Sequence, residues 1–226
     1  EVVLLKNKEY IVSDNLIFRG DGRLIINPGV VLRISDDIRI NFLENSYMYA
    51  VGNKDDFISF EAEDNAWGGV SFGGKKFSTL KFVKFSGIDA REAPCASLVG
   101  CAYNSLVKME DILFRDNDSY YWSNGKTNGD ANQTPNKPVH NRINVTENTI
   151  RTWAAQTTDI HMQVQNLNVI NNSVGGYGLF YIDMQDYTTY RANDSENAGL
   201  ETTFKINVFN STVLYDWYDF KSKTIS

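Results

Sequence analysis

The sequence predicts an all-β fold, a right-handed parallel β-helix in which short strands wind into a solenoid with loop insertions. Three observations favour it: segments with alternating apolar residues, an octet that recurs in the second half of the chain, and turns rich in Asn, Asp and Gly between the segments. We expect one domain over residues 1–226, with coils over about 10–214 and a C-terminal cap over about 215–226.

The recurring octet carries the repeat. Its copies begin at Ile112, Ile143, Leu167 and Ile206, which are 31, 24 and 39 residues apart. The first and third positions of each copy are apolar, as in a strand with one buried face. Asn, Asp or Ser residues follow, and they tolerate the backbone geometry of a corner. Coils of roughly 20 to 25 residues with variable loop insertions explain the uneven spacing.

One position of the turn holds an amide in three copies, Asn117, Asn148 and Asn172, and a hydroxyl, Ser211, in the last. Equivalent amides on successive coils can hydrogen-bond along the solenoid axis, so we interpret these residues as a structural ladder. An Asn117 buried in such a ladder would be a poor glycan acceptor.

The N-terminal half adds further strand-like segments. In order, these are residues 24–34 (LIINPGVVLRI), with a tight turn at Pro28-Gly29, then 50–52 (AVG), 57–60 (FISF) and 67–72 (WGGVSF). This order resembles that of pectate-lyase-like right-handed β-helix domains of secreted and cell-surface proteins. The resemblance covers about residues 10–90 and implies the architecture. It specifies no activity, because the fold hosts lyases, hydrolases, adhesins and passive scaffolds.

Composition narrows the class of partner. The chain has 28 acidic and 22 basic residues, a net charge of -6, which disfavours nucleic acid. The sequence contains no run of about 18 apolar residues, so it predicts no membrane span. The chain begins at Glu1 without a leader, so we expect that it was processed or cut from a longer chain, with neighbouring domains as possible partners.

Cysteines and glycosylation sequons point to a secreted or cell-surface location. Cys95 and Cys101 are candidates for a disulfide in an oxidising compartment, and the alternative is a pair of free buried thiols. Asn-X-Ser/Thr sequons, the candidate glycosylation sites, stand at Asn117, Asn132, Asn144, Asn171, Asn193 and Asn210. Asn132 is the weakest of them, because Pro135 follows its Thr134.

Two polar interruptions of the repeat are the candidate binding loops, over about residues 120–138 and 185–199. Loops that project from a rigid scaffold commonly carry binding. Their candidate binding residues are Tyr120, Tyr121, Trp122, Tyr187 and Tyr190. Neighbouring aromatic side chains can stack on sugar rings or anchor a protein partner. The alternative is that they fold back over the solenoid as cover.

The sequence names no catalytic residue and no metal site. Enzymes of the resembling family use calcium-binding acids with a basic residue, or clustered aspartates with a histidine in a Gly-His-Gly setting. His140 and His161 stand in no such setting. We therefore expect no cofactor. The alternative is a calcium ion at residues 116–119 (DNDS), which look loosely like an oxygen-rich calcium loop.

A repeat without a catalytic constellation favours a noncatalytic extracellular module for adhesion or for recognition of a glycan or an extracellular protein, with binding carried by the inserted loops. One alternative is a polysaccharide lyase or glycoside hydrolase, which needs a groove lined by Lys, Arg and carboxylates from consecutive coils. The other is a structural spacer or assembly repeat of a larger surface protein.

Overall fold

The computed structural model describes residues 1–74, 76–89, 107–117, 122–124, 139–146, 149–150, 155–157, 163–170, 173–174, 180–182, 203–209 and 212–213. These residues form strands and no helix, which confirms the all-β class. Accordingly, they contain no helix long and apolar enough to cross a membrane.

The strands lie at intervals along the whole chain. The first ten are β1 (Val2–Leu4), β2 (Glu9–Val12), β3 (Leu16–Phe18), β4 (Arg23–Ile26), β5 (Val31–Ile34), β6 (Ile40–Glu44), β7 (Tyr47–Val51), β8 (Ile58–Ala62), β9 (Val70–Gly74) and β10 (Ser78–Ser86). The others are β11 (Val107–Arg115), β12 (Trp122–Asn124), β13 (Val139–Thr146), β14 (Thr149–Ile150), β15 (Ala155–Thr157), β16 (Gln163–Ile170), β17 (Ser173–Val174), β18 (Phe180–Ile182), β19 (Thr203–Phe209) and β20 (Thr212–Val213).

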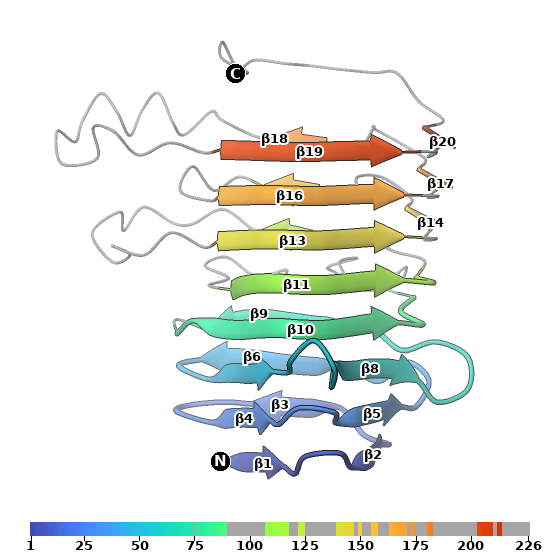
Figure 1. The fold of residues 1–226 in the computed structure, drawn as a ribbon. Helices are drawn as coiled ribbons and strands as arrows, with labels where there is room; N and C mark the ends of the chain where they lie inside the picture. The colour runs from blue at the N-terminus through green and yellow to red at the C-terminus, as the bar shows by residue number, and fades with distance from the viewer. Residues whose placement is uncertain are drawn as a thin grey trace, which may run out of the picture.

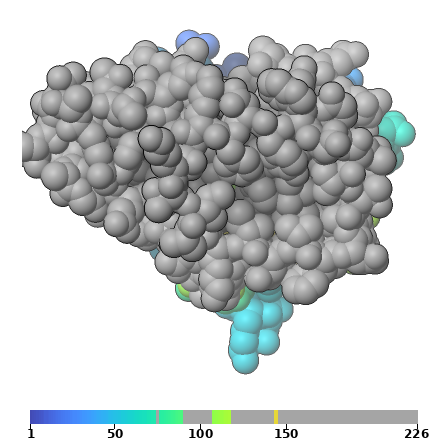
Figure 2. All heavy atoms as spheres, turned by 90° about the horizontal axis from the view of Figure 1, so that it is seen from above, coloured from blue at the N-terminus to red at the C-terminus, as the bar shows by residue number. Residues whose placement is uncertain are grey.

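The strands stack as a parallel β-solenoid, as predicted. One column runs β1-β4-β7-β10-β11-β13-β16-β19, and three shorter columns run β3-β6-β9, β12-β15-β18 and β14-β17-β20. Neighbours in each column pair in parallel, and Figure 1 shows the long column as a ladder of arrows that point the same way. In the view along the stack (Figure 2), cyan atoms of the N-terminal half form a projection at one edge of the molecule.

The predicted register of the octets is confirmed. Ile112 pairs with Ile143, Ile143 with Leu167, and Leu167 with Ile206. The first-position side chains described, those of Ile112 and Ile143, are fully buried. The octet positions therefore predicted both the strand pairing and the buried face of the coil, because a one-residue slip would turn every apolar side chain outward.

Two strands of the early coils become one long strand in the later coils. The first half of β10 pairs with β7 and its second half with β8, so β10 spans both. Residues 52–57 separate β7 from β8, whereas β10 turns the corner at Phe82 alone, and β11 turns it at Asp111. Both corner residues have positive φ, 52° and 55°, a left-handed conformation that is uncommon for residues other than glycine.

The segments that resembled known β-helix domains form the first coils. Residues 24–34 form β4 and β5, and the turn between them contains Gly29 with φ 72°, as predicted at Pro28-Gly29. A Cβ at Gly29 would meet the side chain of Asn7 in the coil below, and the positive φ would be strained for other residues, so glycine is favoured there. Trp67 is fully buried and donates its Nε1–H to the carbonyl of Ser86 at 2.9 Å.

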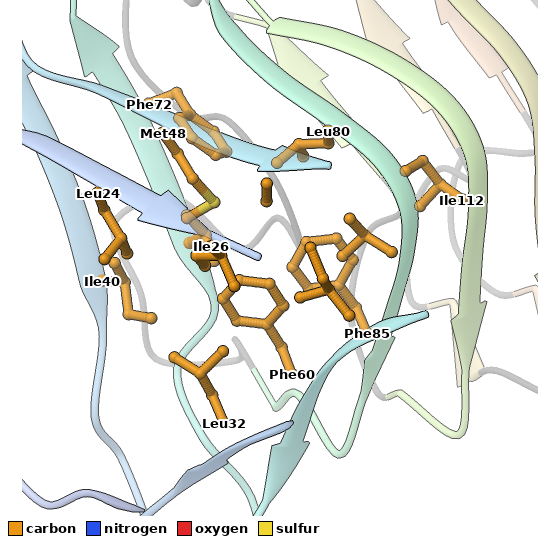
Figure 3. Close-up of a cluster of buried hydrophobic side chains, with 14 of the residues drawn as sticks. Leu24, Ile26, Leu32, Ile40, Met48, Phe60, Phe72, Leu80, Phe85 and Ile112 are labelled. Carbon is orange, nitrogen blue, oxygen red and sulfur yellow. The ribbon is translucent and has the colours of Figure 1, made fainter. Parts of the chain in front are cut away.

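Two columns of phenylalanine side chains run through the core. Figure 3 shows buried apolar residues from successive coils meeting inside the solenoid. Phe60, Phe85 and Phe114 stack with ring centroids 4.9 and 5.3 Å apart. A second stack joins Phe18, Phe42 and Phe72 on the β3-β6-β9 sheet, at 4.8 and 5.3 Å. Repeating the coil places these rings above one another, and stacking adds to burial.

The described member of the predicted asparagine ladder, Asn117, is 3% exposed. Its Oδ1 accepts the N–H of Ile88 at 2.9 Å, and its Nδ2 donates to the carbonyls of Phe85 (3.1 Å) and Arg115 (3.0 Å). The side chain thus ties the corner of its own coil to the corner of the coil below. Asn148, Asn172 and Ser211 lie outside the described residues.

Carboxylates tie other corners together. Asn65 donates its backbone N–H to Asp36 Oδ1 at 3.0 Å and its side-chain Nδ2–H to Oδ2 at 2.6 Å. The side-chain bond from Asn65, followed by the backbone bond, holds the pKa of Asp36 below its ordinary value of 3.8. Hydrogen bonds to the charged form of a carboxyl group favour ionisation.

Acid should weaken this tie. Because the pKa of folded Asp36 is lowered, its stabilisation is complete above the unfolded value of 3.8 and is lost as the pH falls through the folded pKa. We expect Asn65→Ala to reduce the free energy of unfolding at about pH 7 and to reduce it less at about pH 2.5. Urea denaturation at both values measures this, with the exposed Asn45→Ala as the control. An equal loss at both pH values would contradict the prediction.

Candidate functional site

Most of the predicted loop residues lie outside the described part of the chain. Tyr120, Tyr121, Tyr187, Tyr190 and the proposed cap over 215–226 are outside it, as are Cys95 and Cys101. Trp122 is described as the first residue of β12, and it pairs with Ala155 of β15. The interruption over 120–138 therefore contains a strand of the β12-β15-β18 sheet.

Two of the predicted glycosylation sites are described. Asn117 is buried, and both hydrogens of its amide group are engaged with backbone carbonyls, an environment that disfavours a glycan. Asn144 is half-buried on the second octet position and pairs with Leu113 and Asn168. Asn132, Asn171, Asn193 and Asn210 lie outside the described residues.

The described residues contain no cluster of three or more His, Cys, Asp or Glu side chains that could hold a metal ion. In the segment that looked like a calcium loop, Asn117 Oδ1 already accepts a hydrogen bond and the Asp116 carboxylate pairs with Arg115 at 3.3 Å. His140 lies in β13, in register with the buried Met109 of β11, and His161 is outside the described part.

Aromatic and basic side chains gather on the outer face of the sheet formed by β4, β7, β10 and β11. Alternation puts Met48, Leu80 and Met109 in the core and their neighbours outside. One outer column, joined by strand pairing, runs Ile25, Tyr49, Thr79, Lys108. We call this surface the aromatic face, and its members are Arg23, Tyr47, Tyr49, Lys76, Phe77 and Lys108, with Lys81, Phe57 and Phe82 at its border.

Cations lie over the rings of this face. Lys76 Nζ is 5.9 Å from the ring centroid of Tyr47, and Lys108 Nζ is 4.7 Å from that of Phe77. At the border, Lys81 Nζ is 5.5 Å from the ring of Phe82. Each distance falls in the range of cation–π contacts, which are attractive even at exposed positions. Each contact places a cation against one face of a ring.

Acidic groups balance most of the charge of the aromatic face. Arg23 pairs with Glu1, Lys76 with Asp21 at 2.8 Å, and Lys81 with Glu110 at 3.0 Å. The side-chain hydrogen bond from Lys76, followed by its charge, lowers the pKa of Asp21 below 3.8. The pKa of Arg23 is raised, first by its side-chain hydrogen bond with Tyr47 and then by the charge of Glu1. Among the described residues, Lys108 forms no ion pair.

Tyr49 is the most accessible ring of this surface. It is 47% exposed, and Phe57, at the border, is 38% exposed and meets Phe82 edge-on at 5.5 Å. Few large apolar side chains in the described part of the chain are as exposed as these two. The others that are exposed lie in the first coil. The aromatic face therefore offers flat rings beside amine, guanidinium and carboxylate groups.

A second outer column serves the fold. Glu9, Arg33, Glu61 and Lys84 alternate in charge across β2, β5, β8 and β10. Their contacts are 3.1 Å from Arg33 to Glu9, 3.2 Å from Arg33 to Glu61 and 3.3 Å from Lys84 to Glu61. Because these charges neutralise one another between successive coils, we interpret the column as a fastening of the stack.

Sequence reasoning missed the aromatic face. The segment over 47–51 (YMYAV) alternates as a strand with two outward tyrosines, which was the available signal. The other members of the aromatic face come from the coil before this segment and from the two coils after it, and the pairing of Thr79 with Tyr49 and Lys108 brings the later ones beside it. Comparison of the chain with family models, curated proteins and solved structures found no match.

Proposed function

We propose that the chain is a noncatalytic extracellular recognition module that binds an extended glycan along the aromatic face. The observation that carries this proposal is the exposed ring of Tyr49, with Tyr47 and Phe77 beside it and Lys76 and Lys108 over their rings. A sheet of stacked coils is a rigid and flat support, so a ligand meets side chains whose positions are set before binding.

The chemistry of the face suits sugars. Aromatic rings bring large rigid contact area, and their faces match the C–H-bearing faces of sugar rings. Arg23, Lys81 and Glu110 provide donors and acceptors for hydroxyl groups at the edges. Because acids neutralise most of the cations, the face has little surplus charge, and the whole chain is acidic with net charge -6. This balance favours a polyhydroxylated ligand over a nucleic acid.

The finer features of the sequence prediction complete the proposal. The coils are right-handed and of the pectate-lyase-like type, and the protein is secreted or cell-surface and serves in adhesion. It is a glycoprotein with a Cys95–Cys101 disulfide, and the segments over 120–138 and 185–199 add specificity for the glycan or bind an extracellular protein. These features rest on the resemblance, the sequons and the cysteine pair.

Binding should depend on Tyr49. A glycan array identifies the best oligosaccharide, and titration calorimetry then measures its dissociation constant. We expect Tyr49→Ala to weaken binding by about 10-fold or more, because a central aromatic contact is worth roughly 1 to 2 kcal/mol. Ile17→Ala, at a comparably exposed apolar residue on β3, should leave the constant unchanged.

Two outcomes would overturn the proposal. One is the absence of any binding glycan on the array, and the other is depolymerisation of a polysaccharide by the purified chain, which would indicate an enzyme. Lys108→Ala adds a test of charge: for an acidic glycan it should weaken binding and reduce the salt dependence of the dissociation constant. For a neutral glycan, the dissociation constant should not depend on salt in either the wild type or Lys108→Ala.

A further inference from the structure

On the basis of the proposed function, we infer that the glycan on the aromatic face carries an anionic group on every second sugar, and that Lys108 binds this group. The pairing of the lysines, the position of Lys108 and the spacing of the coils support this class of ligand. All three features belong to β7, β10 and β11, and each of these strands pairs with a strand on both sides in the interior of the stack (Figure 1).

Lys108 differs from the other lysines of the aromatic face and its border. Lys76 pairs with Asp21 at 2.8 Å and Lys81 with Glu110 at 3.0 Å, so a carboxylate already neutralises each of these amines. Within the part of the chain that the structure describes, Lys108 has no ion pair. A cation without a counterion on the protein attracts an anion from the ligand. The face therefore offers one lysine charge to a ligand.

The ring of Phe77 orients this amine without neutralising it. Lys108 Nζ is 4.7 Å from the ring centroid of Phe77, an attractive contact between a charge and a π face. The ring carries no net charge, and an ammonium group has three N–H donors, so the amine can still donate to an anion. Lys108 is also half-buried, which leaves less side-chain freedom to be lost when an anion binds.

Strand pairing sets the distance between Lys108 and the exposed ring of Tyr49. Tyr49 pairs with Thr79, and Thr79 pairs with Lys108, so the three residues form one outer column across β7, β10 and β11. Neighbouring strands lie about 4.8 Å apart, which puts the backbone of Lys108 about 10 Å from that of Tyr49. A sugar unit in an extended chain advances by nearly one strand spacing. A glycan along this column therefore places one sugar at Tyr49, the next at Thr79, and the third, with its anionic group, at Lys108.

A glycan with a charge on every sugar fits this column less well. Its middle sugar would place an anionic group at Thr79, whose hydroxyl group is uncharged. The next outward residue on β10 is Lys81, which is engaged with Glu110. Glu110 follows Lys108 by two residues on β11, and its negative charge disfavours a second anion here. Alternating charge therefore gives Lys108 a partner and places no second anion beside Glu110.

Titration calorimetry with oligosaccharides of equal length tests the charge pattern. Two alternating probes carry one anion on every second sugar, a carboxylate in hyaluronan fragments and a sulfate in keratan-type fragments. Oligogalacturonate carries a carboxylate on every sugar, and chito-oligosaccharide is uncharged. We expect one of the alternating probes to bind most tightly, and the comparison of the two identifies the anion. Tightest binding of oligogalacturonate or of the uncharged probe would overturn the proposed ligand class.

Lys108→Gln tests the residue. For the preferred alternating probe, we expect its dissociation constant to be about 5-fold weaker, because a charge-assisted contact is lost at a half-exposed position. Lys84→Gln removes the same charge from the neighbouring outer column, where Lys84 pairs with Glu61, and should change the constant by less than about 2-fold. Equal effects of the two variants would mean that the general charge of the chain attracts the glycan, and they would contradict a contact at Lys108.

Thr79→Lys tests the spacing. This variant adds a cation one coil nearer to Tyr49, at the position of the middle sugar. It should strengthen the binding of oligogalacturonate by about 3-fold or more, and that of the alternating probe by less, because only the first has an anion on that sugar. An equal gain for both probes would contradict the alternating register along the column.

Tyr49→Ala in the same titrations separates the ligand class from the proposed function. Binding that weakens in Tyr49→Ala and stays unchanged in Lys108→Gln would keep the glycan site and reject its anionic ligand. Binding that weakens in both variants is the expected result. If none of the probes binds and the array finds no other glycan, the proposed function fails, and the ligand class fails with it.

Discussion

Replacing Phe85 with alanine should lower the free energy of unfolding by about 3 to 5 kcal/mol. Phe85 is fully buried and is the middle ring of the stack with Phe60 and Phe114, at 4.9 and 5.3 Å. Its removal opens a cavity between two coils, and the rings on both sides lose a stacking partner as well as buried area. Each coil of a solenoid is stabilised by its neighbours, so the loss also uncouples β8 from β11 through β10.

Urea denaturation followed by circular dichroism measures this effect. Phe57→Ala is the matched control, because it removes the same side chain from a position that is 38% exposed, and we expect a loss below about 1 kcal/mol there. Phe85→Leu should fall between the two, because it keeps part of the volume. A Phe85→Ala loss no larger than that of the control would show that the stack does not hold the coils together.

The sequence was sufficient for the pairing in the second half of the chain. Ile112, Ile143, Leu167 and Ile206 pair as the octets predicted. The reason is physical: a strand with one buried face fixes its register to the nearest residue, and the asparagine corner fixes where the strand ends. The alternating pattern is the same in coils of either hand, so the right-handed winding stays a prediction.

The corners and the aromatic face could not be predicted in this way. Phe82 and Asp111 adopt positive φ inside what the sequence shows as continuous strands. Phenylalanine gives no signal of this conformation, and aspartate, although enriched in it, adopts other conformations far more often. The number of residues per coil varies because the loops differ in length. The pairing of Thr79 with Tyr49 therefore could not be predicted from their spacing in the sequence. Without that pairing, Tyr47, Phe77 and Lys108 are scattered residues. The surface is a property of the stacking.

Asn117→Ala should destabilise the fold by about 2 to 4 kcal/mol, although the change removes few atoms. The N–H of Ile88 and the carbonyls of Phe85 and Arg115 each lose the hydrogen bond that Asn117 makes to them. Buried polar groups left without a partner cost about 1 to 3 kcal/mol each, and relaxation recovers part of this. Asn45→Ala, at an exposed corner, should change the free energy by less than about 0.5 kcal/mol.

Asn117→Asp separates the roles of the two amide atoms. The new carboxylate keeps the shape and can accept from Ile88, but it cannot donate, and it faces the carbonyl oxygens of Phe85 and Arg115. Burial and these oxygens should raise its pKa in the folded state. Relative to the wild type, the variant is therefore most stable below the unfolded value, about pH 3.9, and loses stability as the pH rises through the folded pKa.

This trend is opposite to the one expected for Asp36, whose pKa is lowered. Denaturation of Asn117→Asp, Asn117→Ala and the wild type at about pH 4 and about pH 7 measures it, with each variant compared with the wild type at the same pH. The deficit of Asn117→Asp should grow towards neutral pH, and that of Asn117→Ala should stay constant. A constant deficit for Asn117→Asp would mean that the corner opens to water, and the amide would then not be the tie between coils that its three hydrogen bonds indicate.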